Sequence, residues 1–374
     1  MPRERRGFKE GSCKQRPNGK WQARVTTDGR RLSHDFATKT EGLAWIRKQQ
    51  SEADQGMLLP DKAKITVETF LTVRWLPTIE PELKPKSHEG YDRVMRRDVL
   101  PTLGKLLLTQ LRQDQIQALY AAKLKAGLSA TTVRLVHAVL HRSMEDAVKW
   151  RLLRRNPCEG VSIPRARKKE MKVWAPAEAQ RFLASVTDPK LMALYRVALG
   201  CGLRQGEIRG LRWDDLDLQA GTLQVKRTLV WCKGLGITAG EPKTAKGRRL
   251  VVMPAATTEA LRSWRLEQLR RRHFMGKQWK QTGYVFSNLV GGPMQAEKLR
   301  QDFEKAIEAA GLPVIRFHDL RHTAATLLLS KGVHAKVVSE MLGHANIAIT
   351  LDTYSHVLPS MQAEAARVME GLLP

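Results

Sequence analysis

The stretch FHDLRHTAATLL, residues 317–328, places His318, Arg321 and His322 in the first turns of a predicted helix. Leucine and alanine residues recur there at helical spacing and form an apolar face. Cationic side chains are unfavourable at this end of a helix, because the helix dipole is positive there. Three interpretations account for them: a metal held by the i and i+4 histidines, an anion such as a phosphate, or a first turn that faces solvent.

Positive charge extends along the whole chain. The 374 residues include 64 lysines and arginines against 37 aspartates and glutamates, a net charge of +27. The excess is +6 in residues 1–60, +10 in residues 61–170 and +11 in residues 171–374. Because every part is basic, each domain is expected to contact the same polyanion, and nucleic acid is the leading candidate. A basic protein without that role, such as a ribosome-associated factor, is the alternative.

Cysteine usage and hydropathy bear on where the protein acts. The four cysteines form no CxxC pair, so the sequence predicts neither a zinc ribbon nor a disulfide framework, and a reducing cytoplasm fits. No apolar run approaches the length of a membrane span, and the basic N-terminus lacks the apolar core of a secretion signal. We therefore expect a cytoplasmic protein that makes no contact with a membrane.

Residues 11–50 are predicted to form a small module of three strands and one helix. The turn signals PNG and DG separate short alternating runs, one of which contains Ala23 and Val25. A helical segment follows, with Thr40 as its expected N-cap. Basic side chains flank the sheet and are candidates for DNA binding: Lys20, Arg24, Arg30 and Arg31.

The rest of the chain is predicted to be mostly helical. Residues 65–157 show helical apolar spacing, and Ser129 is the expected N-cap of the last helix there. Polar segments at 51–64 and 154–171 resemble linkers. Residues 172–374 add one β interval at about 221–253, in which ITAGEPKTAKG is expected to form a hairpin tip. The predicted fold class is mainly α with small β elements.

Two motifs of the last domain resemble the signatures of the tyrosine recombinases, the phage integrase family. GCGLRQGEIRGLRWDDLDL resembles the first signature, and HDLRHTAATLLLSKGVHAKVVSEMLGHANIAITLDTYSHV resembles the second, with PKTAKGRR between them in the family's order. The resemblance implies three domains. These are an arm-site DNA-binding domain at 1–62, a helical, SAM-like core-binding domain at 63–165 and a mixed α/β catalytic domain at 172–374.

The resemblance also implies the reaction. Arg204 and Arg321 would stabilise the phosphate in the transition state, because guanidinium groups match phosphate geometry with two hydrogen bonds each. Tyr354 would be the nucleophile that forms a 3′-phosphotyrosine, and Lys243 would protonate the leaving 5′ oxygen. No metal, ATP or other cofactor is expected, because arginines supply the charge and the covalent link conserves the bond energy.

Other residues of the motifs receive supporting roles. His318 and His344 match histidines that hydrogen-bond the phosphate or move a proton, and Glu207 matches an acid that orients an arginine. His322 is interpreted as a structural neighbour. Arg249, like Arg248 beside it, is expected either to contact the backbone or to be solvated.

The resemblance finally implies the partners. These are double-stranded DNA with core and arm attachment sites, a homotetramer on two DNA sites, and an accessory DNA-bending or directionality factor, in a bacterial host at the nucleoid. An apolar stripe near the C-terminus fits packing on a neighbouring protomer or on its own domain. The alternatives are a non-catalytic DNA-binding protein on an integrase fold, a metal-dependent hydrolase using His318 and His322, and a topoisomerase-like relaxing activity.

Overall fold

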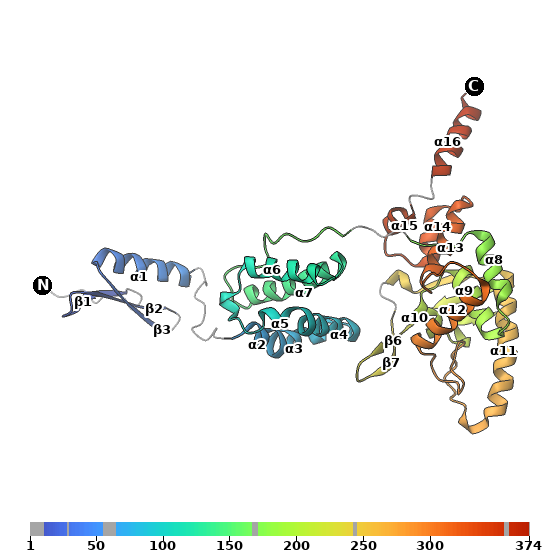
Figure 1. Ribbon diagram of the computed structural model, residues 1–374, viewed down its shortest axis with the longest axis horizontal. Helices are drawn as coiled ribbons and strands as arrows, with labels where there is room; N and C mark the ends of the chain where they lie inside the picture. The colour runs from blue at the N-terminus through green and yellow to red at the C-terminus, as the bar shows by residue number, and fades with distance from the viewer. Residues whose placement is uncertain are drawn as a thin grey trace. The chain divides into compact units, whose positions relative to one another are not determined.

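The computed structural model describes residues 11–27, 30–54, 65–166, 171–241, 245–354 and 359–373 (Figure 1). The chain divides into two compact units, Met1–Arg167 and Lys168–Pro374. The first unit contains two hydrophobic clusters that share no residue, one in the N-terminal sheet and one in the helical segment. The finer division into three domains, with the boundaries given above, stays a prediction.

The N-terminal module has the predicted sheet and helix. Strands β1 (Ser12–Gln15), β2 (Trp21–Thr27) and β3 (Arg30–Phe36) pair antiparallel in that order. Ala23 and Val25 form a small core with Ile46 of α1 (Lys39–Asp54). The expected cap at Thr40 is wrong. Thr38 Oγ1 accepts the backbone N–H of Glu41 at 3.3 Å, and Glu41 accepts that of Thr38 at 3.2 Å, so this capping box starts the helix earlier.

The helical segment is organised around its last helix, α7 (Ala130–Lys149). The predicted N-cap is confirmed, because Ser129 Oγ accepts the backbone N–H of Thr132 at 3.2 Å. The helix buries a stripe at helical spacing: Val133, Val136, Leu140, Met144 and Ala147. The other helices are α2 (Val67–Thr69), α3 (Leu76–Ile79), α4 (Pro85–Val94), α5 (Leu100–Leu103) and α6 (Gln113–Lys125).

The second unit contains the predicted β interval in a different arrangement. Strands β4 (Leu216–Asp217), β5 (Thr222–Val225) and β8 (Arg249–Val252) form one sheet. Strands β6 (Thr228–Cys232) and β7 (Gly236–Gly240) form a separate hairpin. Residues 236–240 are therefore a strand and not the expected hairpin tip. The turn lies at residues 233–235, where Gly234 adopts a φ of 80° that favours glycine. Lys243 lies outside the described residues.

The helices of the second unit surround an aromatic core. Phe182 of α8, Tyr195 of α9 and Phe303 of α12 have ring centroids 4.9–5.7 Å apart, and Trp174 packs beside them. The helices are α8 (Pro176–Ser185), α9 (Pro189–Cys201), α10 (Gln205–Gly210), α11 (Ala255–Met275), α12 (Ala296–Ala310), α13 (Asp319–Ser330), α14 (Ala335–Leu342), α15 (Ile347–Tyr354) and α16 (Pro359–Leu372).

The last helices form a smaller second cluster. Helix α13, which confirms the helix predicted from residues 317–328, packs with α14 and α15, and the three are adjacent in Figure 1. Their shared cluster contains Leu329, Val338, Leu342 and Tyr354. On α16, the apolar side chains at 368, 369 and 372 are exposed. The catalytic motifs thus lie where α9, α10, α13, α14 and α15 meet.

Candidate active site

Arg204 and Glu207 begin helix α10 with a local carboxylate contact. The Glu207 carboxylate accepts the backbone N–H of Arg204 at 3.0 Å through Oε2 and the Arg204 guanidinium at 2.7 Å through Oε1. The predicted ion pair is therefore present. Burial alone would raise the pKa of Glu207, but Arg249 and Arg204 outweigh it and hold that pKa below its ordinary value. The Arg204 side chain is 37% exposed, so a ligand can reach its guanidinium.

Arg321 lies in the first turn of α13 and is almost completely buried. Its Nη1 donates to the carbonyl of Gly202 at 2.7 Å, while its Nη2 has no hydrogen-bond partner within the described part of the chain. Burial, and then the nearby positive charge of Arg204, lower the pKa of Arg321 to about 9. The fold therefore holds a desolvated cation with a free N–H group, and a bound anion would relieve that cost.

Two histidines lie beside this arginine on α13. His318 occupies the N-cap position, and its ring meets that of His322 edge to face, with centroids 5.1 Å apart. His318 is exposed on one side, and the protein on its other side removes part of the water from the ring. That loss, followed by the electrostatic interaction with His322 and the positive charge of Arg321, lowers the pKa of His318 to about 4. Burial also lowers the pKa of His322, so both rings are suited to hydrogen bonding in their neutral form near pH 7.

Tyr354, the last residue of α15, is fully buried. Its hydroxyl lies 2.7 Å from Nδ1 of His322, and the two rings are 5.9 Å apart. Burial raises the pKa of Tyr354 to about 12, and the charge of Arg321 opposes that rise. The phenol is therefore protonated at neutral pH, and it needs a base and access to a substrate before it can attack. The sequence predicts His322 as a structural neighbour, and the structure makes it the direct partner of the tyrosine hydroxyl.

His344 follows the C-terminus of α14 and contacts α15. Its Nδ1 lies 2.8 Å from Oγ1 of Thr350, which is completely buried one turn before Tyr354. Burial, followed by the charges of Arg321 and Arg204, lowers the pKa of His344 to about 4. The carbonyl of Gly343 accepts Nη2 of Arg204 at 3.3 Å, which links this corner to α10.

The structure thus brings five of the six predicted catalytic residues together, and the sixth, Lys243, lies outside the described residues. The sequence did not reveal the contacts of three residues of the site, which are His322, Thr350 and Arg249. His322 and Thr350 each carried a signal in retrospect. The first is one helical turn from His318, and the second is one helical turn from Tyr354. Arg249 carried no such signal, because its contacts are with residues far away in the sequence.

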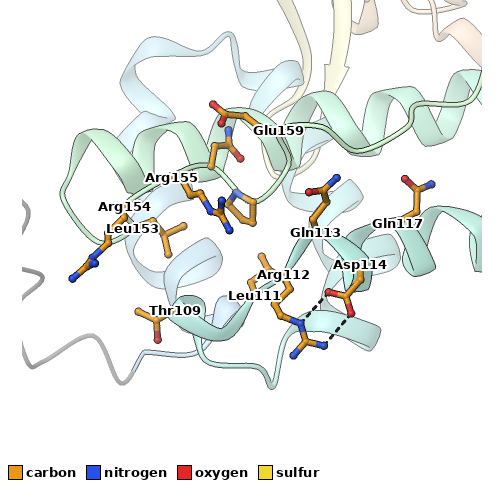
Figure 2. Close-up of a pocket in the computed structure, with 12 residues that line it drawn as sticks. Thr109, Leu111, Arg112, Gln113, Asp114, Gln117, Leu153, Arg154, Arg155 and Glu159 are labelled. Atoms are coloured by element: carbon orange, nitrogen blue, oxygen red, sulfur yellow. Dashed lines mark hydrogen bonds and ion pairs between the residues drawn. The ribbon is translucent and has the colours of Figure 1, made fainter.

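A metal site and a pocket in the helical segment are two further features that could carry chemistry. Among the described residues, no group of three or more histidine, cysteine or acidic side chains could hold a metal ion. Figure 2 shows a pocket of about 840 Å³ in the helical segment, lined by the start of α6 and the residues that follow α7. Arg112 in this pocket is paired with Asp114 at 2.9 Å, and no nucleophile with an adjacent base lines it. The pocket therefore offers no catalytic arrangement.

Two of the candidate DNA-binding residues of the N-terminal module, Arg24 and Arg31, lie on one face of its sheet. Arg24 is exposed on β2 between the buried Ala23 and Val25, so it lies on the face opposite to α1. Arg31 pairs with Thr26, two residues from Arg24, and shares that face. Lys20 is exposed just before β2, and the side chain of Arg30 lies outside the described ones. The sheet thus presents at least two arginines on its uncovered side.

Comparisons with known proteins agree with this geometry. The family model described as "Phage integrase family" matches residues 173–361. A second model, described as "Phage integrase, N-terminal SAM-like domain", matches residues 66–124. A tyrosine recombinase XerC-like protein of Caldanaerobacter subterraneus subsp. tengcongensis is 29% identical, over 95% of this chain and 97% of its own.

Two solved structures share the fold. The Tn1549 transposon integrase in complex with a circular intermediate DNA has a TM-score of 0.69 at 24% identity, covering 81% of this chain and 99% of that one. The lambda integrase tetramer bound to a Holliday junction has a TM-score of 0.58 at 16% identity, covering 94% of this chain and 96% of that one.

This chain belongs to the phage integrase family. It is a tyrosine-type site-specific DNA recombinase, an enzyme that cuts DNA strands and rejoins them. Within the described part of the chain, no helix has the length and apolar character needed to cross a membrane.

The lowered pKa of His344 predicts a pH-dependent loss of stability. The unfolded histidine binds a proton near pH 6.5, whereas the folded one does so only near pH 4. Its contribution to stability is therefore complete above pH 6.5 and is lost as the pH falls toward 4. Between pH 7.5 and pH 5, His344→Gln should lose about 1–2 kcal/mol less unfolding free energy than the wild type, measured by urea denaturation. Equal losses in the two proteins would contradict the assignment.

Proposed function

We propose that Tyr354 cuts DNA by attacking a phosphodiester held between Arg204 and Arg321. The observation that carries this proposal is the buried Arg321, which has a free Nη2 at the N-terminus of α13 and lies close enough to Arg204 for the two charges to repel. Two arginines and a helix N-terminus converge on a region where Glu207, a single carboxylate that Arg249 also shares, supplies too little negative charge to balance them. A phosphate supplies the missing charge.

Arg204 and Arg321 are proposed to act mainly in the transition state. The phosphorus becomes five-coordinate there and its non-bridging oxygens gain negative charge, so fixed guanidinium groups bind that state more strongly than the starting phosphodiester. Removing one contact of this kind typically costs about 3–4 kcal/mol of transition-state stabilisation. His318 and His344 are proposed to add neutral hydrogen bonds to the same phosphate, and His318 also stands where it can accept a proton.

The proposed reaction conserves the energy of the broken bond. A bond forms between the Tyr354 oxygen and phosphorus, the bond from phosphorus to the 5′ oxygen breaks, and the product is a 3′-phosphotyrosine with a free 5′ hydroxyl. The tyrosine proton passes to a base, and a general acid protonates the leaving oxygen. We assign the general acid to Lys243. A 5′ hydroxyl from another strand then reverses these steps and rejoins the DNA without ATP.

The structurally similar integrases suggest the DNA substrate and the assembly in which this chemistry is used. The Tn1549 integrase was solved with a circular intermediate DNA, and the lambda integrase was solved as a tetramer on a Holliday junction. We infer that this chain likewise recombines the ends of a mobile element as a homotetramer on double-stranded DNA. The exposed apolar side chains of α16, at 368, 369 and 372, supply a surface for a neighbouring protomer. An accessory DNA-bending or directionality factor and an association with the bacterial nucleoid belong to the same proposal.

The nucleophile can be tested directly. Tyr354→Phe removes one oxygen from a buried side chain, so DNA binding should be kept while cleavage is lost. The substrate is a core site, taken from the DNA flanking the coding region, with a nick just beyond the scissile phosphate that traps the covalent product. The wild type should form a denaturation-resistant adduct on a gel, and Tyr354→Phe should form none. The matched control is Tyr195→Phe, another fully buried tyrosine, whose hydroxyl has no partner among the described residues and which should form the adduct normally. An adduct with Tyr354→Phe would refute the assignment.

The general acid can be tested with a substrate that does not need one. A bridging 5′ sulfur at the scissile bond leaves as a thiolate without protonation. Lys243→Ala should therefore cleave the oxygen substrate about 100-fold or more slowly than the wild type, and the sulfur substrate at a rate close to the wild type. The measurement is the single-turnover rate on each substrate. Equal defects on both would assign Lys243 to charge stabilisation instead.

The N-terminal module is proposed to bind arm sites that lie away from the site of cleavage. The uncovered face of its sheet carries Arg24 and Arg31, and Lys20 and Arg30 flank it. A sheet of this width can enter the major groove while the arginines contact the phosphates on either side. The separate hydrophobic cluster of the module supports independent folding.

Removing the module should separate cleavage from recombination. A chain that begins at Ile65 should form the Tyr354 adduct on a nicked core site, because every proposed catalytic residue lies beyond residue 200. It should lose recombination between complete attachment sites, measured by the appearance of recombinant product. Undiminished recombination by the shortened chain would refute the arm-binding proposal, and loss of core-site cleavage would show that the module belongs to the catalytic assembly.

A further inference from the structure

Arg249, at the start of strand β8, is held by three different segments of the catalytic unit. Its Nη2 donates to Oε2 of Glu207 at 3.0 Å, its Nε donates to the carbonyl of Met341 at 2.6 Å, and its Nη1 donates to the carbonyl of Gly247 at 3.1 Å. The side chain is only 7% exposed. A buried arginine with one acceptor on each nitrogen is fixed in position, and it does not reach solvent as the sequence allowed.

The shared carboxylate gives this arginine an electrostatic role. Glu207 uses Oε1 for Arg204 and Oε2 for Arg249, so a single negative charge serves two cations. Without Arg249, Glu207 would neutralise Arg204 alone and weaken its attraction for a phosphate. With Arg249 present, the three groups keep a net positive charge, and the exposed member of the set is Arg204.

The same side chain also positions the end of α14, where His344 begins the next segment. Gly343 adopts a φ of 66°, and a Cβ placed there would lie 2.8 Å from Nη1 of Arg249 and 3.0 Å from its Cδ. The backbone at Gly343 therefore rests on Arg249, while the Gly343 carbonyl accepts Arg204. These contacts form a closed ring from Arg204 through Glu207, Arg249 and the end of α14 back to Arg204.

We propose that Arg249 is a positioning residue of the recombination reaction. It touches no substrate, and it holds Glu207 and the end of α14 so that Arg204 and His344 face one phosphate. The inference rests on the proposed function of Tyr354 and the two phosphate-binding arginines.

The experiment is a double-mutant cycle on cleavage of the nicked core site by the full-length protein. The variants are Arg249→Gln, Glu207→Gln and the combination of both, and the control is Arg248→Gln. Arg248 is the neighbouring arginine, and its side chain is 62% exposed where it pairs with Glu241 at the surface. The measured quantities are the single-turnover cleavage rate and the affinity for the same DNA.

Arg249→Gln should cleave about 10–100-fold more slowly than the wild type, as is typical when the partner of an active-site group is lost. Its DNA affinity should change by less than about threefold, because the side chain is buried away from the substrate. Because Arg249 acts through Glu207, the double variant should be little slower than the slower single variant. Arg248→Gln should match the wild type.

Three outcomes would overturn the proposal: cleavage by Arg249→Gln within twofold of the wild type, fully additive defects in the double variant, or a loss of DNA affinity as large as the loss of rate. If Arg249→Gln does not fold, as judged by circular dichroism, Arg249→Lys decides the matter. Lysine keeps the charge but offers one ammonium group to three separated acceptors, so a wild-type rate for Arg249→Lys would refute the positioning role. Adduct formation by Tyr354→Phe would instead refute the proposed function on which this inference rests.

Discussion

The catalytic unit depends on positive charges that the fold holds together without enough negative charge to balance them. Arg204, Arg249 and Arg321 lie around one buried carboxylate, Glu207, and a free N–H group of Arg321 remains unsatisfied among the described residues. Burying such a set is costly, and the packed aromatic core of the same unit must offset that cost. The arrangement is therefore poorly suited to the free protein and well suited to a protein with a phosphate in place. This difference in binding is what a catalyst of phosphoryl transfer needs.

Backbone carbonyls at two helix ends add contacts that orient the arginines without adding a negative charge. Helices α9 and α14 each end at a glycine with a left-handed conformation, Gly202 and Gly343. The carbonyl of the first accepts Arg321, and the carbonyl of the second accepts Arg204. A carbonyl fixes the direction of a guanidinium group through a hydrogen bond but leaves its charge available. Glycine at these positions thus serves both the end of the helix and the electrostatics of the site.

The groups proposed to move protons are kept neutral by their surroundings. His318 and His344 have pKa values lowered to about 4, and Tyr354 has its pKa raised to about 12, in each case with loss of solvent as the largest cause. Two hydrogen bonds connect α15 to the histidines around it. Thr350 contacts His344, and Tyr354 contacts His322, which lies beside His318. The helix that carries Tyr354, the proposed nucleophile, is therefore tied to both histidine-containing segments. A change in the position of α15 would alter the nucleophile and the phosphate contacts together.

The sequence alone determined the elements and the chemical groups. Periodicity and capping residues predicted the N-terminal sheet, the helical segment and α13, because these signals are local: Ser129 caps α7 through a residue three positions away. The order of the motifs likewise predicted that Arg204, Arg321 and Tyr354 belong to one site, since a signature preserves residue type and spacing. The hairpin position and the cap of α1 were missed where a competing local signal, at Gly234 and at Thr38, was stronger than the one chosen.

Only the tertiary structure decided how these groups are connected. Arg249 joins residues 207 and 341, His322 meets the hydroxyl of Tyr354, and Gly202 receives Arg321 from across the unit. Each contact joins positions that are 32 to 119 residues apart in the chain. Spacing along a sequence cannot encode such distances, because they are set by how the helices pack and not by the turns of any one helix.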